Sequence, residues 1–304
     1  MNGRQRVLRV LRGEPVDRVP RGEVRLDDEF VRALMGFRRR RAVIGRVEQN
    51  ATIAALNLDL ITIDAGTAAQ GLSAEVDKAQ LHGVGEWRGS GLAVFVRVDG
   101  PFNRLVAGLG PEETRHWLDG LRKSPFSPPE MAAAQTRRAM DRAAGAGADA
   151  VLIADDHRQI TPELASPEQV RRYYLPALQM SIRSARAHRL PVFLHLADWL
   201  WPALDELASP VPDGLQGLAG VPLDEVRARV SPAICLWGNV APEWLAGPRS
   251  SDEIEAEARR LLLAGGSRYL FGTASGLRGD MNVQTVLSLF DAVASVSAAP
   301  DVGI

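Results

Sequence analysis

The sequence of 304 residues contains a single cysteine, Cys235, and this scarcity excludes several classes of protein. One cysteine cannot form an internal disulfide framework or a multi-cysteine zinc site. Long apolar runs are also missing, since none approaches the ~18 residues that are needed to span a bilayer. The basic N-terminal stretch interleaves its charges with leucine and valine, so it lacks the apolar core of a signal peptide. These absences predict a cytoplasmic protein with no membrane partner.

A strong charge of either sign is absent as well. Lys and Arg total 36 and Asp and Glu total 37, which gives a formal net charge of −1. No basic field therefore draws the chain to nucleic acid, and we expect a small-molecule substrate instead. The one basic run, Arg38–Arg41, is interpreted as a solvated helix edge or a polar turn, with an anion contact as the alternative.

Short strand-like runs alternate with helical patterns along the whole chain. The clearest run, Val192–Leu196, is apolar, contains His195 and leads directly into an amphipathic stretch. Continuous apolarity of this kind is what a parallel sheet covered on both faces requires. A doubly wound sheet fits the alternation too, but no Gly-x-Gly-x-x-Gly motif follows any run. The eight runs predict a single (β/α)₈ barrel over residues 1–304 and lie at 19–25, 58–64, 92–98, 150–154, 192–196, 214–218, 234–238 and 269–272.

Polar residues end most of these runs. In a barrel of alternating strands and helices, the carboxyl ends of the strands meet at one mouth, where reactive groups collect. Acids that cluster there repel one another, which raises some pKa values and suits proton transfer or the binding of a cation. The candidates at this mouth are Asp64, Asp99, Asp155, Asp156, His157, His195, Asp198, Asn239, Thr273 and Ser275.

Several of these candidates also have a structural interpretation. Asp198 directly precedes a helical pattern and is suited to cap it, and the acids at 155 and 156 can bind loop amides. His195 fits a hydrogen-bonded core histidine as well as a catalytic one. Asp64 precedes a loop rather than an apolar helix start, so we favour a functional role for it. Cys235 lies inside an apolar run and is interpreted as an inert buried thiol.

Six stretches resemble the uroporphyrinogen decarboxylase superfamily, in the same order and over nearly the whole chain. They are LRGEPVDRVP at 11–20, VDGPFNRLVAGLG at 98–110, AGADAVLIADD at 146–156, YYLPAL at 173–178, LWGNVAPEWL at 236–245 and FGTASGLRGDMN at 271–282. The resemblance implies a (β/α)₈ barrel with its site at the carboxyl mouth. This superfamily includes a tetrapyrrole decarboxylase that uses no metal or organic cofactor. It also includes zinc-dependent methyltransferases that move methyl groups between corrinoid proteins and thiols.

The signature that the resemblance implies for a decarboxylase is altered here. The family's Arg-Gln-Ala-Gly-Arg motif, whose arginines grip substrate carboxylates, corresponds to RLDDE at 25–29. Arg25 fits the first arginine, whereas Glu29 replaces the second. A carboxylate at that position reverses the sign of the interaction and argues against a polyacidic tetrapyrrole. The family's central aspartate, which faces the pyrrole nitrogens, matches Asp64, and the histidine of its late Gly-His-Gly becomes Ser275.

The methyltransferase signature is altered too. The resemblance implies zinc held by a His-x-Cys at a strand end and by a second cysteine in the late glycine loop. In this sequence His195 is retained, while Ala197 and Ser275 stand in place of the two cysteines. No thiolate remains to build such a site, and we expect neither a metal nor a cofactor. The alternative is a different metal site made from His195, Asp198 or the acids of the stretch 155–157.

These features predict a decarboxylase-like lyase that differs from a standard uroporphyrinogen decarboxylase. Asp64 is expected to stabilise a protonated pyrrole-type intermediate while Arg25 orients a carboxylate. The alternatives are methyl transfer with a corrinoid protein as partner, and a non-catalytic ligand- or partner-binding barrel; a homodimer is left open. The predicted catalytic residues are Asp64, His195 and Asp155, and the predicted substrate-binding residues are Arg25, Glu29, Asp156, His157, Asp198, Asn239 and Ser275.

Overall fold

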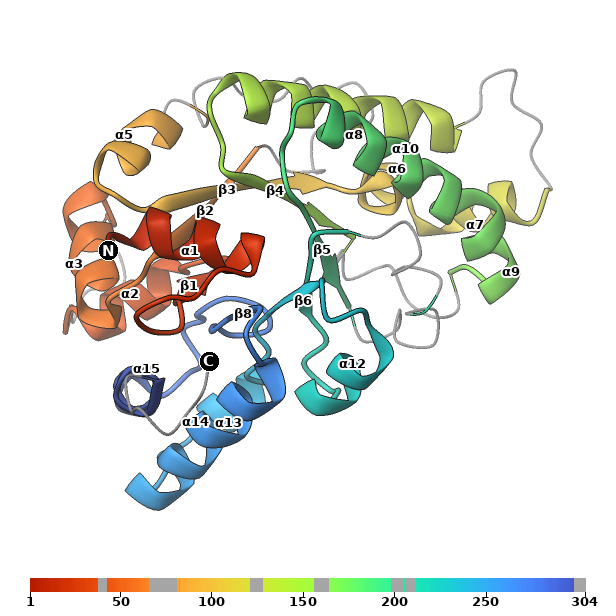
Figure 1. Ribbon diagram of the computed structural model, residues 1–304. Helices are drawn as coiled ribbons and strands as arrows, with labels where there is room; N and C mark the ends of the chain where they lie inside the picture. Colours follow the sequence, from red (N-terminus) through yellow and green to blue (C-terminus); the bar gives the residue numbers. More distant parts are fainter. Residues whose placement is uncertain are drawn as a thin grey trace. The chain divides into compact units, whose positions relative to one another are not determined.

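The computed structural model describes residues 1–37, 43–65, 81, 83–120, 128–155, 164–197, 205 and 212–297. Its eight strands form one sheet whose order follows the chain from β1 to β8 (Figure 1). The pairs β1–β2, β3–β4, β4–β5 and β7–β8 are all parallel. The predicted (β/α)₈ barrel is therefore confirmed. In the described ranges, no helix combines the length and the apolarity that a membrane crossing needs.

The strands are short and the helices between them vary in length. The strands are β1 (Gly22–Glu23), β2 (Leu60–Asp64), β3 (Ala93–Asp99), β4 (Ala150–Ala154), β5 (Val192–Leu196), β6 (Gly214–Gly217), β7 (Cys235–Trp237) and β8 (Tyr269–Leu270). The helices of the first half are α1 (Gly3–Arg12), α2 (Asp28–Leu34), α3 (Arg46–Leu56), α5 (Gly83–Gly89), α6 (Pro101–Leu109), α7 (Pro111–Leu118) and α8 (Pro128–Gly145). The later helices are α9 (Pro167–Gln169), which runs through a π-helical turn at Val170–Tyr174 into α10 (Leu175–Ala187), then α12 (Leu223–Arg229), α13 (Pro242–Leu245), α14 (Ser251–Gly265) and α15 (Val283–Ser297).

The chain divides into two compact units. The first comprises Met1–Thr62, Arg88–Ala93 and Gln216–Ile304, and the second comprises Ile63–Trp87 and Val94–Leu215.

The helix ends follow local sequence signals. Asn2 and Gln5 form a reciprocal capping box at the start of α1, and Ser250 and Glu253 form another at the start of α14. Each box satisfies backbone N–H groups that the first helical turn leaves without a partner. Helix α1 ends at Gly13, whose φ of 73° is a left-handed conformation that glycine adopts without strain.

In the first unit, β8 pairs with both of its neighbours. The register between β7 and β8 aligns Leu236 with Tyr269 and Trp237 with Leu270. On the other side, the N–H of Gly22 donates to the carbonyl of Phe271 (2.9 Å), whose own N–H donates to Pro20 (2.8 Å). Strand β1 is much shorter than the predicted run 19–25, because its ladder with β2 covers only Gly22 and Glu23.

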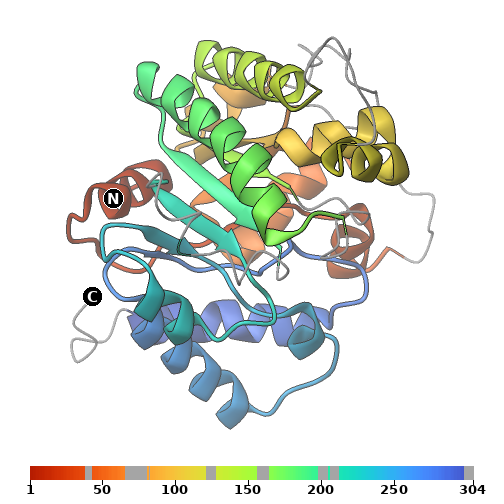
Figure 2. The same cartoon turned by 90° about the vertical axis from the view of Figure 1, so that its right-hand side faces the viewer.

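In the second unit, β3, β4 and β5 form a continuous parallel ladder. Helices α8 and α10 lie side by side, and α10 packs against β5 (Figure 2). The side chains of these strands are almost entirely buried. The rings of Phe95 on β3 and Phe193 on β5 approach to 5.1 Å between centroids, although β4 separates the two strands. Side chains of β3 and β5 can meet across β4 only on the concave side of the sheet, so this face is the barrel interior.

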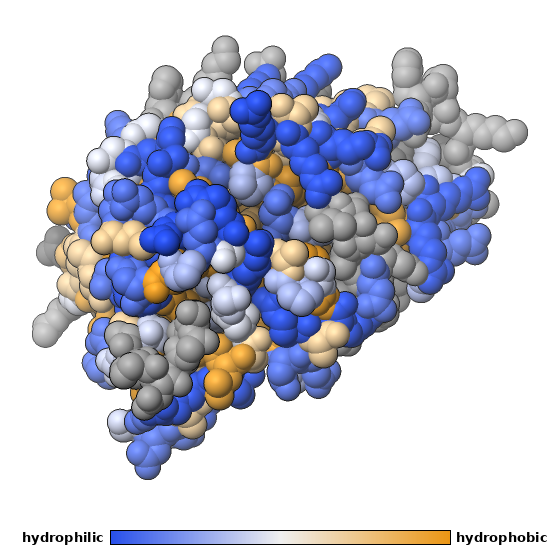
Figure 3. All heavy atoms as spheres, viewed as in Figure 1, coloured by the Kyte–Doolittle hydropathy of each residue, from blue (hydrophilic) through white to orange (hydrophobic). Residues whose placement is uncertain are grey.

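Hydrophilic side chains dominate the face shown in Figure 3. Among the described residues, the large apolar side chains that remain exposed are Met1, Phe37, Val43, Val47, Met131 and Leu263. A few exposed apolar residues are ordinary for a folded protein. Most of the apolar side chains instead pack between the strands and the helices.

A clamp made by an aspartate recurs at the start of every second strand through β6. Asp59, Asp149 and Asp213 directly precede β2, β4 and β6. Each one bonds twice to a single residue at the start of the preceding strand. Its backbone N–H donates to that residue's carbonyl, and its carboxylate accepts that residue's N–H. The pairs are Asp59 with Arg21 (2.7 and 2.9 Å), Asp149 with Val94 (2.8 and 3.0 Å), and Asp213 with Val192 (2.8 and 2.8 Å).

The pattern changes before β8. Arg268 stands at the equivalent position there, and its carbonyl accepts the N–H of Leu236 (2.9 Å). Its guanidinium donates to the carbonyls of Leu11 and Ala233. A two-point clamp fixes which residues lie opposite each other, and in a sheet this register decides the face on which every later side chain lies.

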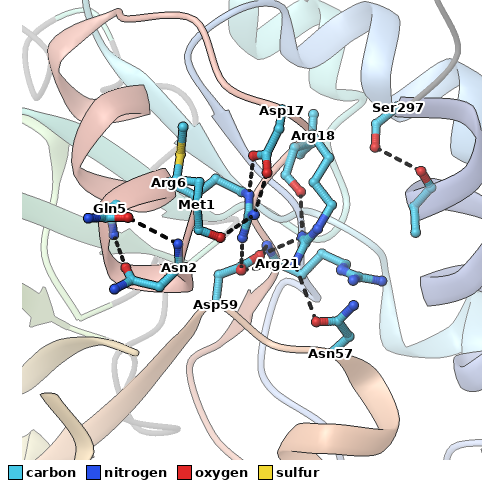
Figure 4. A network of polar contacts seen from close by, with 12 residues as sticks. Met1, Asn2, Gln5, Arg6, Asp17, Arg18, Arg21, Asn57, Asp59 and Ser297 are labelled. Atoms are coloured by element: carbon cyan, nitrogen blue, oxygen red, sulfur yellow. Dashed lines mark hydrogen bonds and ion pairs between the residues drawn. The ribbon is translucent and has the colours of Figure 1, made fainter. Parts of the chain in front are cut away.

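Asp59 carries more contacts than the other two aspartates (Figure 4). Its carboxylate accepts Arg6 Nη1 at 2.5 Å and Arg18 Nη1 at 2.6 Å. Arg6 also donates to both carboxylate oxygens of Asp17, at 2.6 and 2.7 Å, and this pairing lowers the pKa of Asp17 to about 2. The buried Asp59 thereby ties α1 and the segment before β1 to the start of β2.

We predict a ranked loss of stability for three aspartate variants. Asp59→Ala leaves Arg6 and Arg18 without their shared carboxylate and should lower the free energy of unfolding by about 3–5 kcal/mol. Asp149→Ala leaves the N–H of Val94 unsatisfied and should cost about 1–3 kcal/mol. The control Asp252→Ala, at an exposed first-turn position of α14, should stay below about 1 kcal/mol. Urea denaturation measures all three, and an equal loss for the three variants would contradict the clamp.

Candidate active site

An aspartate and an arginine meet at the carboxyl ends of β2 and β3. The N–H of Ala65 donates to the carbonyl of Arg97 (2.9 Å), which places Asp64 directly opposite Arg97. Arg97 Nη1 lies 3.4 Å from Asp64 Oδ1 and 3.7 Å from Asp99 Oδ1. Side chains two residues apart on a strand share one face, so Arg97 and Asp99 face the interior together with Phe95.

His195 lies on the same interior face. The register aligns Asp99 with Ala154 and Ala154 with His195 across three neighbouring strands. Since residues that are directly aligned share a face, His195 follows Phe193 into the interior. Ala154 contributes only a methyl group between Asp99 and His195. The mouth of the second unit thus brings together Asp64, Arg97, Asp99 and His195.

The exposed fractions separate these groups into an outer pair and an inner support. The side chain of Asp64 is 40% exposed and that of Arg97 is 19% exposed, whereas Asp99 is buried. The amide of Asn103 donates to Asp99 Oδ1 at 3.2 Å. The buried Asp99 carboxylate therefore neutralises and positions the Arg97 guanidinium. The partly exposed Arg97 and Asp64 side chains stay accessible to a ligand.

Sequence reasoning missed Arg97. A signal was present in the sequence. Arg97 is the only charged residue at positions 92–98, and it lies two residues from both Phe95 and Asp99, so the three side chains face the same side of the strand. A cation at an inward position of a barrel strand must be neutralised by nearby acids or serve a ligand. Here it does have acidic neighbours, and it also remains partly exposed.

Asp155 has a structural role. It directly follows β4 and is 1% exposed, and its Oδ1 accepts the N–H of Asn103 at 2.7 Å. Asn103 is the third residue of α6, so this carboxylate caps α6 from a neighbouring strand. A Cβ on Gly100 would lie 2.0 Å from Asp155 Oδ2, which explains why glycine occupies the residue before α6. Burial, with Asp155 beside it as an acid and hydrogen-bond partner, raises the pKa of Tyr174 well above its usual value.

A second arginine lies beneath this network. Arg104 is buried, and its Nε donates to the carbonyl of Asp99 at 3.2 Å. Burial lowers the pKa of Arg104, while Asp99 and Asp155 act in the opposite direction. The hydroxyl of Thr136 donates to the same carbonyl at 2.9 Å. These contacts fix the end of β3 and so the position of Asp99.

Four further predicted residues lie in the first unit, and their surroundings differ. Arg25 is exposed and pairs with Asp27 at 2.7 Å, and Glu29 is exposed in the first turn of α2. The Asn239 amide is buried and donates to the carbonyls of Leu218 (2.9 Å) and Val221 (2.7 Å), so it holds a loop. Ser275 Oγ is buried and has no hydrogen-bond partner among the described residues.

The remaining predicted residues, Asp156, His157 and Asp198, lie outside the described residues, as does the run Arg38–Arg41. The site assignments as a whole stay predictions. For the second unit, the structure supports Asp64 and His195 as partners of a common face. Asp155 instead accepts a backbone hydrogen bond from the first turn of α6.

The donors of the methyltransferase zinc site are not present. The resemblance puts Ala197 and Ser275 in place of the two thiolates, and the only thiol, Cys235, is buried inside β7 with its Sγ 3.8 Å from the carbonyl of Leu236. A histidine, a methyl group and a hydroxyl do not make the sulfur-rich set that such a zinc ion requires.

Comparisons with known proteins show the family and the fold. The family model described as "Uroporphyrinogen decarboxylase (URO-D)" matches residues 93–296, which is more than half of the chain. The chain therefore belongs to the uroporphyrinogen decarboxylase family. Arg97, Asp99, Asp155 and His195 lie within the matched residues, and Asp64 precedes them. No curated protein matches the sequence.

Solved structures share the fold at low sequence identity. A methyltransferase from Methanosarcina mazei is 18% identical, with a TM-score of 0.79, over 97% of this chain and 99% of that one. A B12-independent methionine synthase from Shewanella is 10% identical, with a TM-score of 0.55, over 84% of this chain and 89% of that one. An L-ribulose 3-epimerase is 12% identical, with a TM-score of 0.55, over 92% and 94% of the two chains. At these identities the likeness concerns the fold alone.

We predict that Asp155 and Asp64 respond differently to substitution. Asp155→Ala removes the cap of α6 and a hydrogen-bond partner of Tyr174, and should lower the free energy of unfolding by about 2–3 kcal/mol. Asp64→Asn keeps the shape of an accessible side chain and should change it by less than about 1 kcal/mol. Thermal or urea unfolding separates the two. A stability loss at Asp64 that equals the loss at Asp155 would show that both acids are structural.

Proposed function

We propose that the chain is a carboxy-lyase that removes a carboxylate from a small, electron-rich aromatic ligand of the pyrrole type. The observation that carries this proposal is the accessible pair of Asp64 and Arg97 on the interior face, with His195 aligned beside it. One side chain of this pair suits an anion and the other suits a cation. A pyrrole carboxylate presents both charges during decarboxylation, since its ring becomes cationic when it takes up a proton.

Arg97 binds the carboxylate of the ligand. A guanidinium donates two parallel hydrogen bonds to a carboxylate, which sets its orientation as well as its position. Asp99 keeps the Arg97 guanidinium at the mouth, 3.7 Å away. Arg25, which the resemblance suggested for this task, is 57% exposed and already pairs with Asp27, so we assign the task to Arg97 instead.

Asp64 stabilises the charge that develops on the ring. A proton adds to the ring carbon that bears the leaving group, and this makes the ring cationic. The bond between that carbon and the carboxylate then breaks, CO₂ leaves, and the bonding electrons return to the ring, which restores its neutral aromatic state. A fixed carboxylate beside the ring lowers the energy of the cation before any solvent rearranges. His195 is the group on this face that can deliver the proton.

Among the residues that the structure describes in the second unit, Arg97 is the arginine that faces the interior at the mouth. A standard uroporphyrinogen carries many carboxylates, and the resemblance puts Glu29, an exposed carboxylate, in place of the arginine that would grip a second one. We therefore propose a ligand with one or two carboxylates, acted on in the cytoplasm.

Methyl transfer is the second candidate, since the methyltransferase from Methanosarcina mazei has this fold over nearly its whole length. In that case a corrinoid protein would be the partner, and the acids of the mouth would activate the methyl acceptor in place of a metal thiolate. A barrel that binds a ligand without converting it is the third.

We predict decarboxylation of at least one member of a small panel of pyrroles that carry the carboxylate on a ring carbon: pyrrole-2-carboxylate, pyrrole-3-carboxylate and pyrrole-2,5-dicarboxylate. Uroporphyrinogen, whose many carboxylates lie on side chains, is the comparison that should not react. Mass spectrometry would detect the loss of one CO₂ per event. Arg97→Gln should raise KM by about 10–100-fold, because a charge-assisted contact to the carboxylate is lost. Asp64→Asn should lower kcat by about 10²–10³-fold, because the cationic ring loses its counter-charge.

The matched control is Arg259→Gln, which removes a surface arginine that pairs with Glu255 and should leave both constants unchanged. If no panel member loses CO₂ at stoichiometric enzyme concentration, the lyase proposal is wrong. Demethylation of a methyl donor that depends on added corrinoid protein would then support the second candidate. Tight binding of a panel member without product would support the third.

A further inference from the structure

Glu23, in β1, is a buried carboxyl that the reaction proposed above does not use. It is 2% exposed, and both of its oxygens contact a single residue of the segment after β8. The N–H of Thr273 donates to Glu23 Oε1 at 2.9 Å, and the hydroxyl of Thr273 lies 2.6 Å from Oε2. Thr273 is itself 1% exposed. The contact thus joins the two strands whose pairing closes the barrel.

No cation faces this carboxyl within the residues that the structure describes. Thr62 on β2 donates to the Glu23 carbonyl, and the Trp237 indole on β7 donates to the neighbouring Gly22 carbonyl. Tyr269 on β8 is a titratable group whose pKa the charge of Glu23 affects. Burial, the largest cause, raises the pKa of Tyr269 well above its usual value, so the phenol stays neutral. On its own chain segment, Arg21 donates to the carbonyl of Phe290 and Arg25 pairs with Asp27. Burial raises the pKa of Glu23 to about 8, although Thr273 acts in the opposite direction.

The segment that Glu23 contacts, Thr273–Leu277, is joined to its neighbours by isolated bridges rather than by a strand ladder. The Gln216 amide donates to the carbonyls of Thr273 (2.9 Å) and Ala274 (3.0 Å). The N–H of Ala274 donates to the Val240 carbonyl, the N–H of Leu277 donates to the Arg25 carbonyl, and the Leu277 carbonyl accepts the N–H of Asp27. The segment therefore lies outside the ladders that hold the sheet together.

We propose that Glu23 is a proton-operated latch: in its neutral form it holds Thr273 against β1, and loss of its proton loosens Thr273–Leu277. An ionised carboxylate in a dry site without a cation carries a large desolvation cost. Admission of water relieves that cost, and Thr273–Leu277, which lies outside the strand ladders, is the part of this contact that we expect to move. Since Ser275 lies within the segment, the latch sets the position of one side of the mouth of the first unit, whatever reaction the protein performs.

The latch has a thermodynamic signature with a defined sign. Between the ordinary pKa of a glutamate, 4.5, and a folded-state pKa of about 8, the folded chain keeps a proton that the unfolded chain has lost. The folding equilibrium constant should therefore fall as pH rises through this window, by up to about tenfold for each pH unit. Glu23→Gln cannot ionise and removes this dependence.

The experiment is hydrogen exchange of the peptide that contains Thr273, measured between pH 6 and pH 9 and corrected for intrinsic exchange. In the wild type, protection of this peptide should fall by up to about tenfold for each pH unit between pH 6 and about pH 8, and level off above pH 8. In Glu23→Gln it should not change over the whole range. The matched control is Glu253→Gln, which alters an exposed capping glutamate and should follow the wild type.

A second measurement decides the matter if Glu23→Gln does not fold. Carbon-13 NMR of glutamate side chains in the wild type reports the titration of Glu23 directly, and we expect a midpoint near pH 8. A midpoint below pH 6 would overturn the proposal. So would a loss of protection between pH 6 and pH 8 that Glu23→Gln shows to the same degree as the wild type.

Discussion

The aspartate clamp at the start of β2, β4 and β6 is the constraint on which the rest of the structure depends. Each clamp bonds one residue of the preceding strand at two points, so the register of that strand pair is set before the ladder begins. Side chains alternate between the two faces of a strand, and a slip of one residue would turn every interior group outward. The clamp at Asp149 fixes β3 against β4 in this way, and with it the face on which Arg97 and Asp99 lie.

At the carboxyl ends of the strands, the same register decides which polar side chains face the barrel interior and which contact the surrounding helices. Arg97, Asp99 and His195 lie at inward positions and collect at the mouth. Asp155 follows the small interior residue Ala154 and serves α6 instead. The presence of an aspartate at the end of a barrel strand therefore does not by itself predict whether it binds a ligand or supports the fold. The parity of its position along the strand decides whether it faces a ligand or caps the next helix.

Much of the fold could be predicted from the sequence, because apolar runs of four to seven residues mark buried parallel strands directly. The predicted run at 19–25 is a strand only over Gly22–Glu23, since the ladder with β2 ends where the chain turns toward α2. Family membership also followed from motifs along the chain. Both inferences depend on patterns that are local in sequence.

The site was harder to predict because its members are defined by register. Asp64 and His195 could be proposed from their places at strand ends, and their shared face in the second unit agrees with that. Arg97 was missed because it sits within a run that was judged only by its apolarity. Glu23 was missed for another reason: its partner Thr273 is 250 residues away in sequence, and nothing local marks a carboxyl that will be buried without a cation.

The pairing of Asp64 with Arg97 is the central claim, and a crystal structure with bound pyrrole-2-carboxylate tests it most directly. We expect the ligand carboxylate to lie within hydrogen-bond distance of the Arg97 guanidinium, with the ring beside the Asp64 carboxylate and His195 in reach of the ring. A ligand whose carboxylate binds Arg25, or an Arg97 side chain that points away from Asp64 toward the helices, would contradict the account.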